Sequence, residues 1–193
     1  MKKLICLGDS LTFGLRVPQS QTWPRLVQET GVEVINLGIC GDTTGGMLAR
    51  LPAVLKEQGK TQAVVLIMGG SNDIFYSGTD TAARNNLGAM VHQVIAAGLT
   101  PVVGIPLPIV PEDAPKEWEP VANFHEAAKL LESYCAWLKT YCKAFHIPTV
   151  DFREDFLDTR GNARRELYCD GLHPNAQGHR LMAQKLCNFG EKL

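Results

Sequence analysis

The sequence contains neither a long apolar run nor a long run of basic residues. None of its apolar segments approaches the roughly 20 residues that a membrane helix needs. The apolar stretch between Lys3 and Asp9 is also too short for the core of a signal peptide. With a formal net charge of −1, the chain lacks the positive charge that nucleic-acid-binding proteins use to contact phosphates. These absences predict a soluble, cytoplasmic protein that binds no nucleic acid and does not insert stably into a membrane.

Common metal-binding and nucleotide-binding motifs are missing as well. The six cysteines form no C-x-x-C pair, and no Cys/His cluster has zinc-site spacing. The glycines from Gly8 to Gly14 lack the lysine of a phosphate-binding loop, and Gly38 and Gly41 are wrongly spaced for a dinucleotide fingerprint. We therefore expect no cofactor and no metal.

What remains is the composition of a globular protein. The 193 residues are 45% hydrophobic and 20% charged, without an internal repeat or a change of composition along the chain. This predicts one domain spanning residues 1–193. The sequence carries no signal for an oligomeric state.

Short apolar runs alternate with segments of helical periodicity. We expect strands at residues 4–7, 32–37, 63–68, 101–105 and 147–152. We expect helices at residues 22–30, 43–58, 81–97, 122–145 and 174–189, and irregular stretches at 71–80, 106–119 and 153–169. Pro52 predicts a kink or a late start in its helix. The alternation indicates an α/β protein, a three-layer α/β/α sandwich with about five parallel strands.

Polar residues follow the predicted strands at one end of the sheet. Ser10 follows the first strand, Gly41 the second and Asn72 the third, while Asp170 and His173 precede the last helix. In an open parallel sheet, ligands bind beyond the carboxyl ends of the strands. Glycine and aspartate collect in turns in any case, but turn preference explains poorly why these chemical types occur together. We therefore expect the five residues to share one site.

Three of these residues form the parts of an activated nucleophile. The hydroxyl of Ser10 is weakly nucleophilic at neutral pH and needs a base. His173 can accept its proton and later return it to the leaving group. Asp170 can fix the tautomer of His173 and stabilise the imidazolium. The sequence thus predicts a serine esterase that acts on a small-molecule ester through an acyl-enzyme.

The sequence resembles the SGNH hydrolases, also called GDSL esterases/lipases, in four blocks. The matching segments are Gly8-Asp9-Ser10-Leu11, the stretch 36–42 with Gly41, Gly70-Ser71-Asn72-Asp73 and Asp170-Gly171-Leu172-His173. Their order and rough spacing extend over nearly the whole chain. The resemblance implies a flavodoxin-like sandwich and hydrolysis of ester bonds.

An ester hydrolase of this kind must stabilise an oxyanion. The expected donors are the backbone N–H groups of Ser10 and Gly41 and the side-chain amide of Asn72. Glycine allows a close backbone approach at such a position.

The side chains that would select the substrate are predicted less directly. The candidates for substrate contact are Asp9, Phe75, Ile109, Val110 and Trp118. The aromatic and aliphatic members could line an apolar acyl groove or simply seal loops onto the core. Asp9 is also suited to bonding turn backbone. The expected substrates are short- to medium-chain acyl esters, among them acetyl esters of sugars, lysophospholipids or thioesters.

Two alternative functions stay open at this point. A metal-dependent phosphoesterase could use Asp9, Asn72, Asp73, Asp170 and His173 as ligands, although it needs more histidines than these turns contain. A non-catalytic binding module on the same fold is the other, because fold does not prove function.

Overall fold

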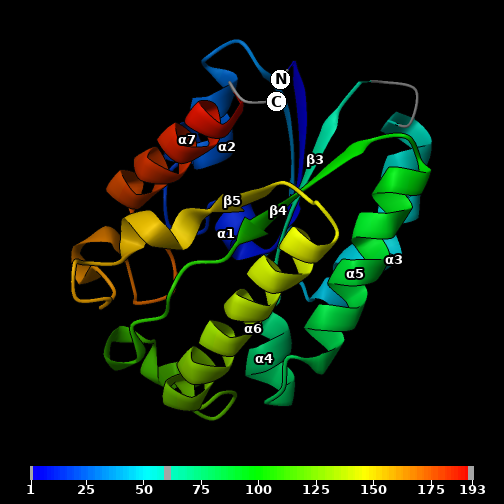
Figure 1. Cartoon of the computed structure of the whole chain (residues 1–193). Coiled ribbons are helices and arrows are strands. Elements are labelled where there is room, and N and C mark those ends of the chain that lie inside the picture. Colours follow the sequence, from blue (N-terminus) through cyan, green and yellow to red (C-terminus); the bar gives the residue numbers. More distant parts are fainter. Residues whose placement is uncertain (1, 59–61, 191–193) are drawn as a thin grey trace.

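The structure is a computed structural model that describes residues 2–58 and 62–190 (Figure 1). In these residues five parallel strands form one sheet, in the order β2-β1-β3-β4-β5. The strands are β1 (Lys3–Gly8), β2 (Glu33–Gly38), β3 (Val64–Met68), β4 (Thr100–Ile105) and β5 (Thr149–Asp151). The predicted parallel sheet is confirmed.

Helices cover both faces of the sheet. Figure 1 shows α2 (Trp23–Gln28) and α7 (Ala176–Gly190) on one side, and α3 (Thr44–Gln58), α5 (Thr81–Ala96) and α6 (Phe124–Ala144) on the other. Side chains of a strand alternate between the two faces of a sheet. In β1, Ile5 and Leu7 accordingly join the core under α3, α5 and α6, whereas Leu4 and Cys6 join the core under α2 and α7. The three-layer α/β/α sandwich is thus confirmed.

The segment after β3 differs from its prediction. Residues 71–80 were expected to be irregular, but Ser71–Ser77 forms helix α4. Gly70 has a φ of +116°, which lets the chain turn directly from the strand into the helix. The polar residues that suggested a loop occupy the first turn of this helix, where short polar side chains are common.

Of the two effects predicted for Pro52, a kink or a late start of its helix, the late start is not observed. Helix α3 begins at Thr44 and contains Pro52, so a late start is wrong. Met47 and Leu51, four residues apart on one face of the helix, are fully buried in the core. Their packing on the sheet favours the helix over the local preference of proline.

The connections near the carboxyl end of the sheet contain short 3₁₀ turns. These are η1 (Gln19–Gln21), η2 (Pro111–Asp113), η3 (Lys116–Trp118), η4 (Phe152–Phe156) and η5 (Arg165–Leu167). The last strand is therefore shorter than expected, since residue 152 already belongs to a 3₁₀ turn. Across residues 2–58 and 62–190, no helix combines the length and apolar character needed to cross a membrane.

Candidate active site

Ser10 is the first residue of the short helix α1 (Ser10–Phe13), which follows β1 after a tight turn at Asp9. Asp9 caps this turn, because its carboxylate accepts a hydrogen bond from Leu11 N at 2.9 Å. A Cβ atom on Gly8 would lie 2.1 Å from the Thr12 hydroxyl and 2.8 Å from the carbonyl oxygen of Met68. Only glycine fits there, so the sequence Gly-Asp-Ser places the serine directly at the end of a central strand.

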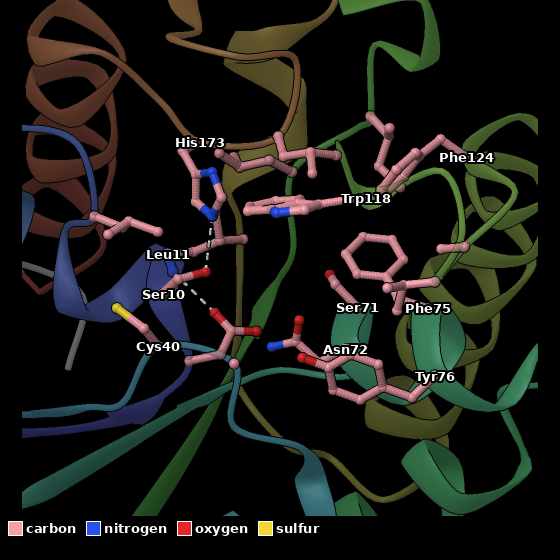
Figure 2. A pocket seen from close by; sticks show the side chains of 18 of the residues that line it. Ser10, Leu11, Cys40, Ser71, Asn72, Phe75, Tyr76, Trp118, Phe124 and His173 are labelled. Carbon is pink, nitrogen blue, oxygen red and sulfur yellow. Dashed lines mark hydrogen bonds between the residues drawn. The ribbon is translucent and has the colours of Figure 1, made fainter. Parts of the chain in front are cut away.

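The structure brings Ser10 and His173 together from opposite ends of the chain. Ser10 Oγ lies 3.0 Å from His173 Nε2 (Figure 2). On the other side of the ring, His173 Nδ1 lies 2.9 Å from Asp170 Oδ2. Asp170 Oδ1 accepts from the backbone N–H groups of His173 at 2.8 Å and Leu172 at 3.1 Å. The loop backbone therefore holds the carboxylate beside the imidazole.

Two carboxyl groups near the serine have displaced pKa values, in opposite directions. Burial acts to raise the pKa of Asp170, but hydrogen bonds from the His173 ring and from two backbone N–H groups outweigh it and lower that pKa to about 2. Burial raises the pKa of Asp9 to about 6, opposed in part by its hydrogen bond from Leu11 N. Asp170 is consequently ionised throughout the neutral range, as a partner for an imidazolium must be.

The predicted oxyanion donors face the same cavity as the serine. Ser10, Gly41 and Asn72 all line it, and Figure 2 shows the side chains of Ser10 and Asn72 turned into it. Asn72 Nδ2 donates to the carbonyl oxygen of Asp42 at 2.8 Å, which fixes the orientation of the amide. An amide nitrogen carries two hydrogens, so one can still be directed at a substrate oxygen. Gly41 has a φ of +76°, in the left-handed region that favours glycine.

Hydrogen bonds join the loops that carry these groups to one another. Arg50 donates from Nε to Asp42 Oδ2 at 2.9 Å and from Nη2 to the Gly8 carbonyl at 3.0 Å. Asp73 accepts from Thr44 N at 2.8 Å and from the Thr44 hydroxyl at 2.6 Å. The turns after β1, β2 and β3 are thus fixed relative to one another by side chains.

An apolar cavity of about 380 Å³ opens beside the serine. Among the predicted substrate contacts, Asp9, Phe75, Ile109 and Trp118 line it. Val110 does not; its side chain is 3% exposed and belongs to the core under α7, which corrects the expectation of a substrate contact. Ile109, the residue before it, lines the cavity instead. Lining residues that were not proposed as substrate contacts include Leu15, Leu107, Val121, Phe124 and Leu172.

The loop 106–119 is attached to the loop that carries His173. Val110 N donates to the Gly171 carbonyl at 2.9 Å, and the Tyr168 hydroxyl donates to the Pro108 carbonyl at 2.7 Å. The ring of Trp118 meets the His173 ring edge to face, with centroids 5.9 Å apart and planes at 87°. One wall of the cavity is therefore fixed to the histidine.

The arginines around the site include one that sequence reasoning missed. Arg16 forms an ion pair with Asp170 through Nε and Oδ2. Arg164 pairs with Glu166 and Arg165 with Asp113 on the surface. No local pattern indicates the contact of Arg16, because its partner lies near the other end of the sequence.

The residues proposed as metal ligands are engaged in other bonds. Asp9 is bonded to Leu11, Asp73 to Thr44 and Asp170 to His173. Within residues 2–58 and 62–190, no group of three or more His, Cys, Asp or Glu is arranged to hold a metal ion.

Comparison with known proteins gives a family match over most of the chain. Residues 6–181 match the model of the GDSL-like lipase/acylhydrolase family. The chain is 32% identical to esterase TesA of Pseudomonas aeruginosa, over 89% of the chain and 79% of that protein. It is 30% identical to the thioesterase 1/protease 1/lysophospholipase L1 of Escherichia coli, over 93% of the chain and 79% of that protein. Among solved structures, the aryl esterase of M. smegmatis superposes with a TM-score of 0.83 at 21% identity, with both chains fully covered.

Proposed function

Because the chain belongs to the GDSL-like lipase/acylhydrolase family and is therefore a hydrolase of ester bonds, we propose that it cleaves carboxylic esters through an acyl-enzyme on Ser10. The observation that carries the proposal is the hydrogen-bonded path from Ser10 Oγ through the His173 ring to Asp170, next to an apolar cavity. Residues 1–193 act as one catalytic domain in this proposal, because its parts come from both ends of the chain.

Each step of the reaction uses a contact described above. Ser10 Oγ attacks the carbonyl carbon while His173 Nε2 takes its proton. The imidazolium is stabilised by Asp170, and it returns the proton to the departing alcohol or thiol as the ester bond breaks. Water then attacks the acyl group on Ser10, with His173 again acting as the base. This second step releases the carboxylic acid and restores the serine.

The oxyanion of both tetrahedral intermediates would be stabilised by three donors. These are the backbone N–H groups of Ser10 and Gly41 and the second amide hydrogen of Asn72. The Asp42 carbonyl and Arg50 hold two of these donors in place before substrate binds. Donors fixed in advance need no reorganisation in the transition state, which is why such groups contribute strongly to turnover.

The cavity supports substrates with short to medium acyl chains. Its volume of about 380 Å³ is near the lower end of the range of ligand pockets, roughly 300 to 1,000 Å³. Phe75 and Phe124 meet edge to face at 5.4 Å in its wall, and Leu172 closes it near His173. An acyl chain would bury apolar surface there, at roughly 0.8 kcal/mol per methylene. Two relatives have names that include esterase or thioesterase, so oxygen and sulfur leaving groups are both included in the proposal.

The experiment compares the parent protein with Ser10→Ala on p-nitrophenyl esters and acyl thioesters of graded chain length. We expect turnover by the parent, none above background by Ser10→Ala, and labelling of Ser10 alone by a fluorophosphonate. A parallel measurement with a chelator addresses the phosphoesterase alternative, which requires loss of activity on metal removal. Absence of turnover on every ester, with no labelling, would favour the non-catalytic alternative.

The acyl-binding role of the cavity has its own test. Ile109→Trp adds bulk to the cavity wall and is expected to shift the preferred chain by two or more methylenes toward shorter acyl groups. Ile95→Trp is the matched control, since Ile95 is 46% exposed on α5, outside the cavity. Replacing residues 106–119 as a whole should likewise change chain-length preference more than the chemical step. An unchanged chain-length preference in both Ile109→Trp and the variant with residues 106–119 replaced would remove the cavity from the proposal.

A further inference from the structure

We propose that Arg16 is a positioning residue of the active site, which holds the Asp170 carboxylate in the orientation that His173 requires. The inference rests on the proposed function, because it assigns Arg16 a role in the reaction of Ser10, Asp170 and His173. Arg16 itself contacts neither the serine nor the histidine in any described interaction, so its effect must pass through Asp170.

The backbone at Arg16 has an unusual conformation. In the described part of the chain, only Arg16 and His146 have a positive φ without being glycine, and the φ of Arg16 is +72°. A residue with a side chain adopts this region at a cost of about 1–3 kcal/mol, so the surrounding structure must favour it. Arg16 comes two residues after Gly14, the left-handed residue that ends α1. This turn brings the guanidinium from the serine-bearing segment to the carboxylate on the opposite loop.

The ion pair completes the set of donors around Asp170. Its Oδ1 accepts from Leu172 N and His173 N, and His173 Nδ1 lies within hydrogen-bonding distance of both oxygens, 2.9 Å from Oδ2 and 3.1 Å from Oδ1. Arg16 Nε supplies the fourth donor, also to Oδ2. A carboxylate has about four lone-pair sites, so these four donors leave it little freedom to rotate. Without Arg16, Oδ2 would be held by the histidine alone, the group that it is meant to orient.

The burial of the two partners also distinguishes this pair from an ordinary surface pair. The Asp170 side chain is 9% exposed, whereas that of Arg16 is 42% exposed. The carboxylate is therefore largely shielded from water, whereas its cationic partner is not. A charge pair with one shielded partner is screened less than a pair that is fully exposed.

A fixed cation at this position also affects protonation of His173. Three further titratable groups lie near the ring: Asp170, which is ionised, Asp9 and His179, the last two close enough to interact with it electrostatically. Asp170 favours the imidazolium and Arg16 opposes it, since like charges repel. Removing Arg16 should then raise the pH at which His173 becomes an effective base.

The test measures kcat and KM against pH for the parent, Arg16→Gln, Arg16→Lys and Arg16→Gly. For Arg16→Gln we expect kcat to fall about tenfold, because the general base His173 is held less well by Asp170. KM should stay within about twofold, because Arg16 does not contact the substrate in this proposal. The acid limb of kcat/KM should move to higher pH, because a positive charge near the ring is removed. Arg16→Lys should keep the acid limb of the parent's pH profile and recover part of kcat, because lysine restores the charge but lacks the planar guanidinium with its fixed donors.

Arg16→Gly separates positioning from stability. Glycine accepts the positive φ without strain, and this relief should offset the loss of the ion pair, so the variant should unfold at a temperature near that of the parent. It should nevertheless show the same kcat loss and pH shift as Arg16→Gln. Arg25→Gln is the matched control, because Arg25 is also an exposed arginine in an ion pair, here with Glu29 at the end of α2. Its profile should coincide with that of the parent.

Two results would overturn the inference. One is that Arg16→Gln and Arg16→Gly have the same kcat and the same pH profile as the parent. The other is that these variants raise KM and leave kcat unchanged. Ser10→Ala measured in the same assay separates this failure from that of the proposed function. If Ser10→Ala retains turnover, the proposed function fails. If it abolishes turnover while the Arg16 variants behave like the parent, only the role of Arg16 fails.

Discussion

Asp9→Asn is expected to stabilise the protein at neutral and alkaline pH. Asp9 is 1% exposed, and burial raises its pKa from 3.8 to about 6. Above pH 6 the folded protein therefore carries a charge that its surroundings disfavour. Asparagine removes this charge but keeps a side-chain oxygen that can accept from Leu11 N.

The magnitude follows from the displaced pKa. A group with a raised pKa in the folded state contributes stability at low pH, and this contribution is lost as the pH rises through 3.8 and then 6. The full difference corresponds to about 3 kcal/mol, an upper limit for the gain in Asp9→Asn. At pH 4.5 most of the carboxyl is still protonated in the folded state, so the gain there should be about 2 kcal/mol smaller than at pH 8.

Urea unfolding of both proteins at pH 4.5 and pH 8 measures this difference. Asp155→Asn is the matched control: Asp155 lies on the surface, where its side chain is 37% exposed and pairs with Lys185. Its substitution should change stability by less than about 1 kcal/mol at either pH. A variant Asp9→Asn that gains the same amount at both pH values, or that is less stable than the parent at pH 8, would refute the reasoning from burial.

Three further predictions concern the oxyanion amide, the histidine loop and a buried histidine. Asn72→Ala should lower kcat by about 10²–10³ with little change in KM, and unchanged turnover would remove Asn72 from the oxyanion site. Gly171→Ala should destabilise the protein by about 2 kcal/mol or more in urea unfolding, because Gly171 has a φ of +73° and a Cβ would lie 2.5 Å from the Val110 carbonyl oxygen. Wild-type stability would show that the loop contact can move. Burial, with a smaller effect of the His173 charge, lowers the pKa of His179 to about 4. The contribution of the neutral His179 ring to stability is present above pH 6.5 and lost toward pH 4. In the Asp9→Asn variant, where Asp9 no longer titrates in this range, the free energy of unfolding in urea should fall by up to about 3 kcal/mol between pH 6.5 and pH 4. A free energy of unfolding that stays constant would contradict the burial of a neutral ring.

The layered fold was predictable because its signals are local. The run Val64–Met68 is apolar at every position, as a strand covered on both faces must be, and the helices on its flanks show regular periodicity. Helix α4 was missed because serine, asparagine and aspartate are common in loops as well as at helix starts. What decides between the two is the conformation of Gly70, which the sequence does not reveal.

The meeting of Ser10 with His173 was predictable for another reason. Both belong to motifs that follow or precede predicted elements at the same end of the sheet, so topology alone brings them close. Confirmation of the ester-hydrolase family agrees with the four-block resemblance. The side on which residue 110 faces was not predictable, since a proline-rich loop has no fixed periodicity. Val110 is buried in the core, whereas its neighbour Ile109 lines the cavity.

The supporting arginines could not be inferred from the sequence. Arg16 pairs with a carboxylate near the other end of the chain, and Arg50 bonds the carbonyl of Gly8 from helix α3. Arginine is common on protein surfaces, and its long side chain leaves many partners within reach. Only three-dimensional coordinates distinguish an arginine that supports a site from one that is solvated.

The bonds of Arg50 have a consequence for thermal motion at the site. One guanidinium connects the carbonyl that precedes the serine turn with the carboxylate of Asp42, beside Gly41. The two turns are therefore linked by a side chain as well as by the sheet, which limits changes in the separation between Ser10 Oγ and the N–H of Gly41. Under the proposed function, alignment of these groups is established when the chain folds and need not be regained in each catalytic cycle.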